Sequence, residues 1–130
     1  EEHPTVVHLV STVSAQLRSG VSWSEIINAT FPPGSVSGAP KFTALKMIND
    51  LEPTARGPYC GAIGVVDADA VTAKLAVGIR TFWLTGDRGH KVLHFGTGAG
   101  ITWGSDPEAE WEESELKARH LTSVAAGVWT

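Results

Sequence analysis

Apolar and polar positions in the first third of the chain predict a strand followed by helices. Residues 5–13 alternate their apolar side chains between two faces, which predicts a strand that runs into a short helix ending at Gly20. Ser22 stands three residues before Glu25, the spacing of a capping box, and this pair predicts the start of a second helix. We expect the proline pair that begins at Pro32 to end that helix.

A third helix is predicted after a loop of small residues at positions 34–40. Apolar side chains recur there at helical spacing, at Ala44, Met47, Ile48 and Leu51. They would form one apolar face, and Pro53 would end the helix.

Strand patterns separated by glycine-rich turns occupy the second half of the chain. Residues 59–66 form a predicted strand interrupted by glycines, and residues 74–84 form a longer one with alternating faces. A turn at 86–89 leads into a strand at 91–95, which we expect to be antiparallel to the strand before it. A second loop of small residues follows at 96–100.

A long helix is predicted near the C-terminal end, starting close to Ser105 and running into the 120s. Ser105 or Asp106 can cap this helix, and Pro107 suits its first turn. Helices combined with an antiparallel hairpin predict an α+β fold. A length of 130 residues suits one domain with one ordinary core.

Composition narrows the range of partners. The formal net charge is −4 and the ten Lys and Arg residues are scattered, so we expect no binding to nucleic acid. Apolar stretches break off well before the roughly 20 residues that a membrane span needs, so we expect no membrane association. Cys60 is the only cysteine, which excludes an internal disulfide and favours the reducing cytoplasm.

Two glutamates on the last predicted helix are candidate metal ligands. Glu110 and Glu113 are three residues apart, so both project from one face and can converge on Mg²⁺, which prefers oxygen ligands. Acidic residues near a helix N-terminus also commonly form a solvated face that complements the helix dipole. Spacing alone leaves both interpretations open.

Arg80 and the two loops of small residues are candidate anion sites. Arg80 interrupts an apolar strand beside Ala76 and Gly78, where it can bind a carboxylate or extend into solvent from a sheet edge. The loops at 34–41 and 96–101 can offer backbone N–H groups to an anion. Both loops lack the spacing of nucleotide-binding motifs, and both also suit plain turns.

Histidine and cysteine show no catalytic pattern by themselves. His8 stands within a predicted strand, where a histidine is more often packed and hydrogen-bonded than catalytic. Cys60 is better interpreted as a small buried residue than as a nucleophile. Residue chemistry alone therefore predicts an α+β domain with an acidic site of oxygen ligands.

Five blocks of sequence in a fixed order carry the most specific pattern in the chain. They are HLVSTV at 8–13, FPPGSVSGAPK at 31–41, LEPTARGPYCGAIG at 51–64, GIRT at 78–81 and GTGAGITWGSDPEAEWEESELKA at 96–118. Together they resemble the chorismate-binding family over almost the whole chain. The resemblance implies that residues 1–130 are the C-terminal portion of a catalytic domain whose N-terminal part is absent. It also implies an antiparallel sheet with packed helices, as in component I of anthranilate and aminodeoxychorismate synthases.

The resemblance assigns roles to charged and aromatic residues at matching positions. It implies a Mg²⁺ site with Glu113 as the direct ligand and Glu110 close by. It implies that Tyr59 and Arg80 bind the side carboxylate of chorismate. Lys117 matches a basic position at the carboxylate and metal end of the site.

The resemblance also implies which residues contact the other parts of the substrate, a carboxylate and the ring hydroxyl. The loop residues Gly98, Ala99 and Gly100 would receive a substrate carboxylate through their backbone. His8 and Ser35 would stand near the ring hydroxyl at C4 as catalytic residues, where departure of the hydroxyl needs a proton donor.

The activity implied is a Mg²⁺-dependent substitution on chorismate, in which the C4 hydroxyl departs and ammonia adds to the ring. Ammonia implies a glutamine amidotransferase as a partner subunit or fused domain. The family's upstream segments supply a further metal-ligand glutamate and, in aminodeoxychorismate synthases, a lysine that attacks the ring at C2, and this chain does not contain them. We therefore expect the chain to be inactive alone, and its self-association through uncovered apolar faces would be unsurprising.

Weaker signs separate the branches of the family. Anthranilate synthases typically carry threonine at the position of Ser35, so this serine favours the aminodeoxychorismate synthase branch of para-aminobenzoate and folate synthesis. The FPPG lead-in and RGPYCGAIG favour it too. The anthranilate synthase branch of tryptophan synthesis is the alternative. A non-catalytic fragment that binds carboxylates is a further alternative, although the retained Arg80, Glu110 and Glu113 argue against decay of the site.

Overall fold

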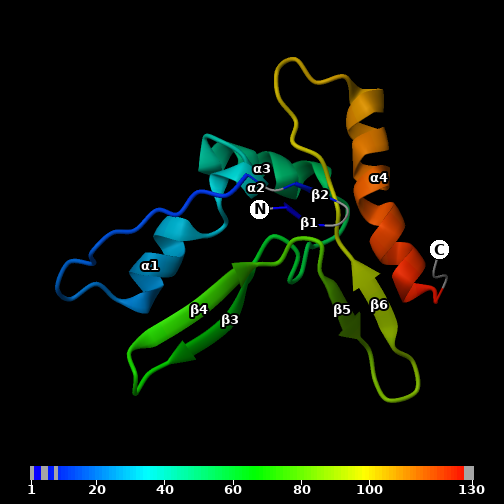
Figure 1. The fold of residues 1–130 in the computed structure, drawn as a ribbon. Coiled ribbons are helices and arrows are strands. Elements are labelled where there is room, and N and C mark those ends of the chain that lie inside the picture. Colours follow the sequence, from blue (N-terminus) through cyan, green and yellow to red (C-terminus); the bar gives the residue numbers. More distant parts are fainter. Residues whose placement is uncertain (1, 4–5, 8, 128–130) are drawn as a thin grey trace.

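The computed structural model describes residues 2–3, 6–7 and 9–127. Its elements follow in the order β1 (Glu2–His3), β2 (Val6–Val7), α1 (Trp23–Thr30), α2 (Gly34–Ser37), α3 (Lys41–Leu51), β3 (Ala62–Asp67), β4 (Thr72–Val77), β5 (Phe82–Thr85), β6 (Val92–Phe95) and α4 (Pro107–Ala125). Figure 1 shows β3–β4 and β5–β6 as two hairpins that diverge from a central region, with α4 beside β6. The mixture of helices and antiparallel strands confirms the α+β class.

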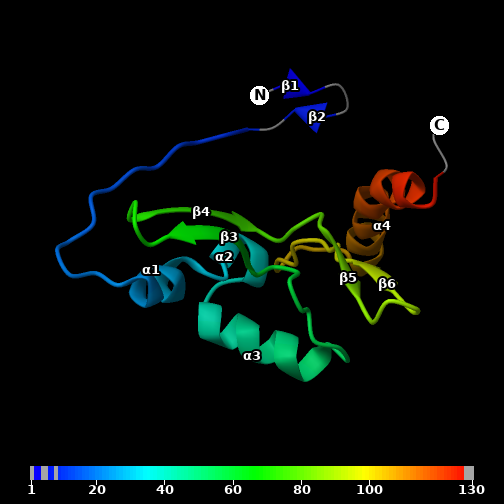
Figure 2. The same ribbon diagram turned by 90° about the horizontal axis from the view of Figure 1, so that it is seen from below.

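The described strands form separate antiparallel pairs, β1–β2, β3–β4 and β5–β6. In the longest pair, Ala62 faces Val77 and the register continues to Asp67 opposite Thr72. The β5–β6 hairpin confirms the predicted antiparallel return of the chain around the turn at Gly86. A single sheet is therefore not formed within these residues, and Figure 2 shows β1–β2 lying apart from the other elements.

The prediction of one continuous strand at 74–84 is wrong. The chain turns within this range, which divides it into β4 and β5. Gly78 still pairs with the segment before β3. Its carbonyl accepts from the N–H of Cys60 at 2.9 Å, and its N–H donates to the carbonyl of Gly61 at 2.9 Å. Arg80 then adopts a left-handed backbone conformation, with φ of 49°, which turns the chain out of the first hairpin. Arg80 therefore does not share a strand face with Ala76, Gly78 and Phe82, as the alternation pattern predicted.

The predicted strand at 59–66 begins later than expected, at Ala62. Residues 57–60 form a turn in which the N–H of Tyr59 donates to the carbonyl of Arg56 at 3.1 Å. Cys60 ends this turn with a left-handed φ of 65°. Only Gly adopts such a conformation without steric cost, so the surrounding hydrogen bonds must hold Cys60 there.

The predicted short helix before Gly20 is not formed. Residues 9–18 carry no regular structure, and Leu9 and Val13 are 100% and 91% exposed. A helix this short needs tertiary packing to persist, and this segment has none. The strand expected at 5–13 is present at Val6–Val7, and His8 lies outside the described residues.

The helix signals at Ser22 and Asp106 are confirmed. Ser22 and Glu25 form the predicted capping box at α1, with the N–H of Ser22 donating to Glu25 Oε2 at 2.8 Å. Asp106 accepts from the N–H of Ala109 at 3.0 Å and caps α4. The small-residue loop at 34–40 contains the one-turn helix α2, which was not predicted. No helix in the described part of the chain has the length and apolarity that crossing a membrane requires.

The expected hydrophobic core is not present within the described residues. Cys60 is the only apolar side chain there that is buried, at 6% exposure. On α3, Ala44 and Ile48 are half-buried, whereas Met47 and Leu51 are exposed. A chain of 130 residues can bury a core of its own. These apolar faces are instead left open, so that another protein segment could cover them.

Candidate active site

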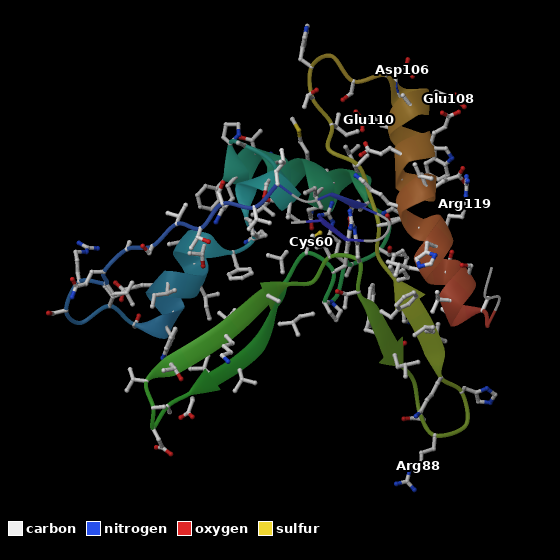
Figure 3. The ribbon with its side chains drawn as sticks, in the orientation of Figure 1. Cys60, Arg88, Asp106, Glu108, Glu110 and Arg119 are labelled. Carbon is white, nitrogen blue, oxygen red and sulfur yellow. The ribbon has the colours of Figure 1, made fainter. Side chains whose placement is uncertain are left out.

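The candidate site is built around Tyr59, at the point where the two central hairpins meet. Tyr59 is half-buried and lies within the tight turn after Arg56. Its neighbour Cys60 lies at the centre of the molecule in Figure 3. Because the N–H of Cys60 donates to the carbonyl of Gly78, the backbone of Tyr59 is held against the start of the β4–β5 connection.

The ring of Tyr59 packs against the glycine loop after β6. A Cβ atom at Gly96 would overlap the Tyr59 ring, and one at Gly98 would lie 3.1 Å from the phenol oxygen. The Gly96 distance is too short for any side chain, and the Gly98 distance is tight, so glycine at position 96 is what allows the loop backbone to approach the ring. The structure thus brings together Tyr59 and Gly98, two of the predicted substrate-binding residues.

Helix α4 holds the other side of this loop. Lys117 Nζ donates to the carbonyl of Gly98 at 3.4 Å, and Thr97 Oγ1 donates to the carbonyl of Ser114 at 3.3 Å. Lys117 also forms an ion pair with Glu113, with Nζ and Oε1 2.8 Å apart. Lys117 therefore links the predicted carboxylate loop to the predicted metal end of the site.

Glu110 carries a buried carboxylate oxygen without a partner. Its Oε1 accepts from Ser105 Oγ at 2.5 Å, whereas its Oε2 is buried and makes no hydrogen bond within the described residues. Figure 3 shows Glu110 on the side of α4 that faces the preceding loop, and Glu108 on the outer side. Burying an unpaired carboxylate oxygen is costly, so this position suits a further donor or a cation.

Charge states at the site follow from these contacts. The hydrogen bond from Lys117 holds the pKa of the Glu113 carboxyl below its usual value, which keeps it anionic at neutral pH. Burial raises the pKa of the Tyr59 phenol, which keeps it protonated. The site therefore offers a hydrogen-bond donor at Tyr59 and an anion at Glu113.

Two carboxylates one helical turn apart fit part of a Mg²⁺ site. The orphaned oxygen of Glu110 and the ionised Glu113 have the hard oxygen chemistry that Mg²⁺ requires. No group of three acidic, His or Cys side chains within the described residues has the geometry to hold a metal ion. Any further ligands must therefore be water, substrate oxygens or residues of another segment.

Other predicted site residues are not joined to this cluster by hydrogen bonds or ion pairs within the described residues. Arg80 is exposed in its left-handed turn, and Ser35 is exposed on α2. Ala99 is half-buried and Gly100 is exposed in the loop before α4. His8 lies outside the described residues.

Sequence reasoning missed Arg56, which contacts the ring of Tyr59. The guanidinium carbon lies 5.6 Å from the ring centroid, and the same group forms an ion pair with Glu52. The four-residue spacing of Glu52 and Arg56 was the available signal, although Pro53 between them excludes the usual interpretation as a helical ion pair.

The chain is similar in sequence to known proteins. Anthranilate synthase component 1 of Neisseria meningitidis serogroup B is 39% identical over 125 residues, which cover 96% of this chain and 24% of that protein. The protein of the same name from Saccharolobus solfataricus is 41% identical over 128 residues, covering 98% of this chain and 29% of the relative. That of Synechocystis is 43% identical over 123 residues, covering 93% and 24%.

The chain thus spans about a quarter of the length of these relatives. Residues 1–123 also match the family described as chorismate binding enzyme. Since this match extends over nearly all of the chain, and the five sequence blocks and the Tyr59 site lie within it, the chain belongs to the family of chorismate binding enzymes.

Proposed function

We propose that these residues form the C-terminal part of a chorismate-utilising synthase of the anthranilate synthase component I type. The observation that carries the proposal is the meeting of Tyr59, the Gly98 loop and the Lys117–Glu113 pair from three separate segments of the chain. In this arrangement Tyr59 is a neutral hydrogen-bond donor, the Gly98 loop offers backbone N–H groups without an acceptor among the described residues, and Lys117 is a cation. The two carboxylates of Glu110 and Glu113 lie on the same helix as Lys117. A substrate with two carboxylates and a bound Mg²⁺ would complement these groups.

The identity of the branch rests on the relatives rather than on Ser35. Ser35 favours an aminodeoxychorismate synthase, but the similar proteins are named anthranilate synthase component 1. One exposed serine on a one-turn helix is a weaker basis than about 40% identity over nearly the whole chain. We therefore favour anthranilate synthesis from chorismate and keep aminodeoxychorismate synthesis as the second candidate.

The side chains at the site support binding and orientation of chorismate. The protonated Tyr59 hydroxyl can donate to one substrate carboxylate, and Arg80 would have to turn toward the same group to form a bidentate pair. None of the hydrogen bonds among the described residues uses the N–H of Gly98 or Gly100, so both are available to a second carboxylate. When bound, Mg²⁺ would supply positive charge beside that carboxylate as the ring hydroxyl departs.

The remainder of the catalytic domain would cover the exposed apolar faces. Phe42 on α3 and Trp103 in the loop before α4 are 87% and 105% exposed, and they belong to a large set of exposed apolar side chains of the kind that marks an interaction surface. Covering them would also bring further metal ligands to Glu110. In this proposal, ammonia comes from a glutamine amidotransferase subunit or fused domain.

Incubation of the 130-residue chain alone with chorismate, Mg²⁺ and ammonium should give no product, because the metal site and the apolar surface are both incomplete. Product analysis by mass spectrometry tests this expectation. Turnover by the purified chain above that of a Glu110→Gln control would contradict it.

The parent protein, meaning the natural polypeptide that contains these residues, tests the function itself. With chorismate, Mg²⁺ and ammonium, we expect it to release anthranilate and pyruvate in equal amounts. Aminodeoxychorismate without pyruvate would move the protein to the second candidate. Failure to consume or bind chorismate would refute both.

A further inference from the structure

We propose that Arg56 is a positioning residue, which holds the ring of Tyr59 in the orientation that receives a substrate carboxylate. This inference rests on the proposed function of Tyr59 and assigns a role to a residue outside the predicted site. Two contacts of the Tyr59 ring support this inference. The Arg56 guanidinium lies over the ring, and the backbone of Gly96 packs against it.

Glu52 fixes the guanidinium. Arg56 Nε donates to Glu52 Oε2 at 2.8 Å, and Nη2 donates to Oε1 at 2.5 Å. This two-bond fork determines the plane of the guanidinium as well as its position, which a single ion pair would not do. The Arg56 and Glu52 side chains are 25% and 37% exposed, so the pair is partly shielded from solvent.

The fixed guanidinium then contacts Tyr59 and the residue that follows it. Its carbon lies 5.6 Å from the ring centroid, within the range of a cation–π interaction. Nη1 also points to Cys60 Sγ at 3.4 Å, so the same group contacts the residue after Tyr59. The backbone of Gly96 also approaches the ring, so closely that a Cβ atom there would overlap it. The ring therefore contacts both Arg56 and the loop that Lys117 holds.

Arg56 is poorly suited to bind substrate itself. Glu52 already occupies two of its N–H donors and neutralises its charge, and its other described contacts are with Cys60 Sγ and the Tyr59 ring. A substrate carboxylate would have to displace Glu52 to form a bidentate pair. Arg56 therefore acts through Tyr59.

The test is a double-mutant cycle on the parent protein. Tyr59→Ala should raise KM for chorismate by roughly 30-fold, and Arg56→Ala by about 10-fold with kcat changed less than about twofold, as expected for lost binding interactions. Adding Arg56→Ala to Tyr59→Ala should change KM less than about twofold, because the two residues act as one unit. Arg56→Lys keeps a cation but not the fork and should restore KM in part.

A spectroscopic measurement separates positioning from general destabilisation. The parent is labelled with 3-fluorotyrosine, and the Tyr59 signal in its ¹⁹F spectrum is assigned by its loss in Tyr59→Phe. Arg56→Ala and the milder Glu52→Gln should both shift this signal, whereas Arg88→Ala, at the tip of the β5–β6 turn in Figure 3, should leave it unchanged.

Each alternative result has a distinct meaning. Suppose that Tyr59→Ala raises KM but Arg56→Ala has no effect on KM, or raises KM by the same factor whether residue 59 is Tyr or Ala. Either result would overturn the positioning role of Arg56 and leave the proposed function standing. An unchanged KM on Tyr59→Ala would refute the substrate-binding role of Tyr59, and the inference with it. An unshifted Tyr59 signal in both Arg56→Ala and Glu52→Gln would also overturn it.

Discussion

Gly96→Ala should lower kcat/KM of the parent protein for chorismate by roughly 100-fold, the cost expected when binding groups are displaced by about 1 Å. A Cβ atom at this position would overlap the ring of Tyr59. The ring cannot easily move away, because Arg56 contacts it and the backbone of Cys60 is bonded to Gly78. The loop must therefore shift, and Gly98 and its contact with Lys117 shift with it.

Gly104→Ala is the matched control for Gly96→Ala. Gly104 lies in the same connection between β6 and α4, and a Cβ atom there would have nothing within 4 Å. Its activity should equal that of the unaltered protein. Thermal unfolding of both variants separates local from global damage, since overpacking at Gly96 should cost about 1–3 kcal/mol. Normal kcat/KM in Gly96→Ala would show that the Tyr59 ring and the loop do not need this contact.

Glu110→Gln should weaken the dependence of activity on Mg²⁺ and lower kcat/KM at ordinary Mg²⁺ by about 100-fold, the upper end of effects seen when groups at a metal site are altered. Glutamine has the same shape and can still accept from Ser105. It removes the negative charge from the buried oxygen that has no partner within the described residues. The measurement is kcat/KM across a Mg²⁺ titration, after the metal has been removed by a chelator.

Glu108→Gln provides the comparison within the same helix turn. Glu108 is exposed and lies on the outer side of α4 in Figure 3, so its loss should leave the Mg²⁺ titration unchanged. Both variants lose one negative charge near the N-terminus of α4, which makes their effects on the helix dipole similar. If the two variants show the same half-saturating Mg²⁺ concentration, Glu110 has no role at the metal.

Chorismate binding with and without Mg²⁺ also separates a catalytic site from a simple carboxylate pocket. A synthase should bind chorismate more tightly with Mg²⁺, and Glu110→Gln should remove this difference. A binding module without chemistry should show equal affinity in both conditions, because Tyr59, the glycine loop and Lys117 do not depend on the metal.

Local signals predicted α1, α3 and α4 well, but they failed for the short helix expected before Gly20, for the one-turn helix α2 and for the strand bounds. The capping box at Ser22 and the Asp106 cap with Pro107 correctly marked two helix starts, because caps depend on side chains and backbone groups only a few residues apart. The strand at 74–84 was wrong because alternation persists on both sides of a turn. β4 ends at Val77, directly before Gly78, and the left-handed backbone of Arg80 then separates it from β5.

The local pattern of apolar residues also could not predict that the described residues lack a buried core. The apolar spacing on α3 predicted a buried face, yet Met47 and Leu51 are 58% and 80% exposed. Periodicity states which side of a helix is apolar, but not whether this chain or another segment covers it.

The amino-acid sequence by itself determined the α+β class, the helix caps, the family and the chemical types of the candidate site residues. Tertiary structure alone decided which of them meet: Tyr59 with the Gly98 loop, that loop with Lys117, and Arg56 with the Tyr59 ring. For the first two contacts the physical reason is distance along the chain, because they join segments brought together by the turns at Cys60 and Arg80. Arg56 and Tyr59 are only three residues apart, and they meet through the tight turn at residues 57–60. The left-handed backbone of Cys60 in that turn is held by its hydrogen bond to Gly78 rather than favoured by its own residue type.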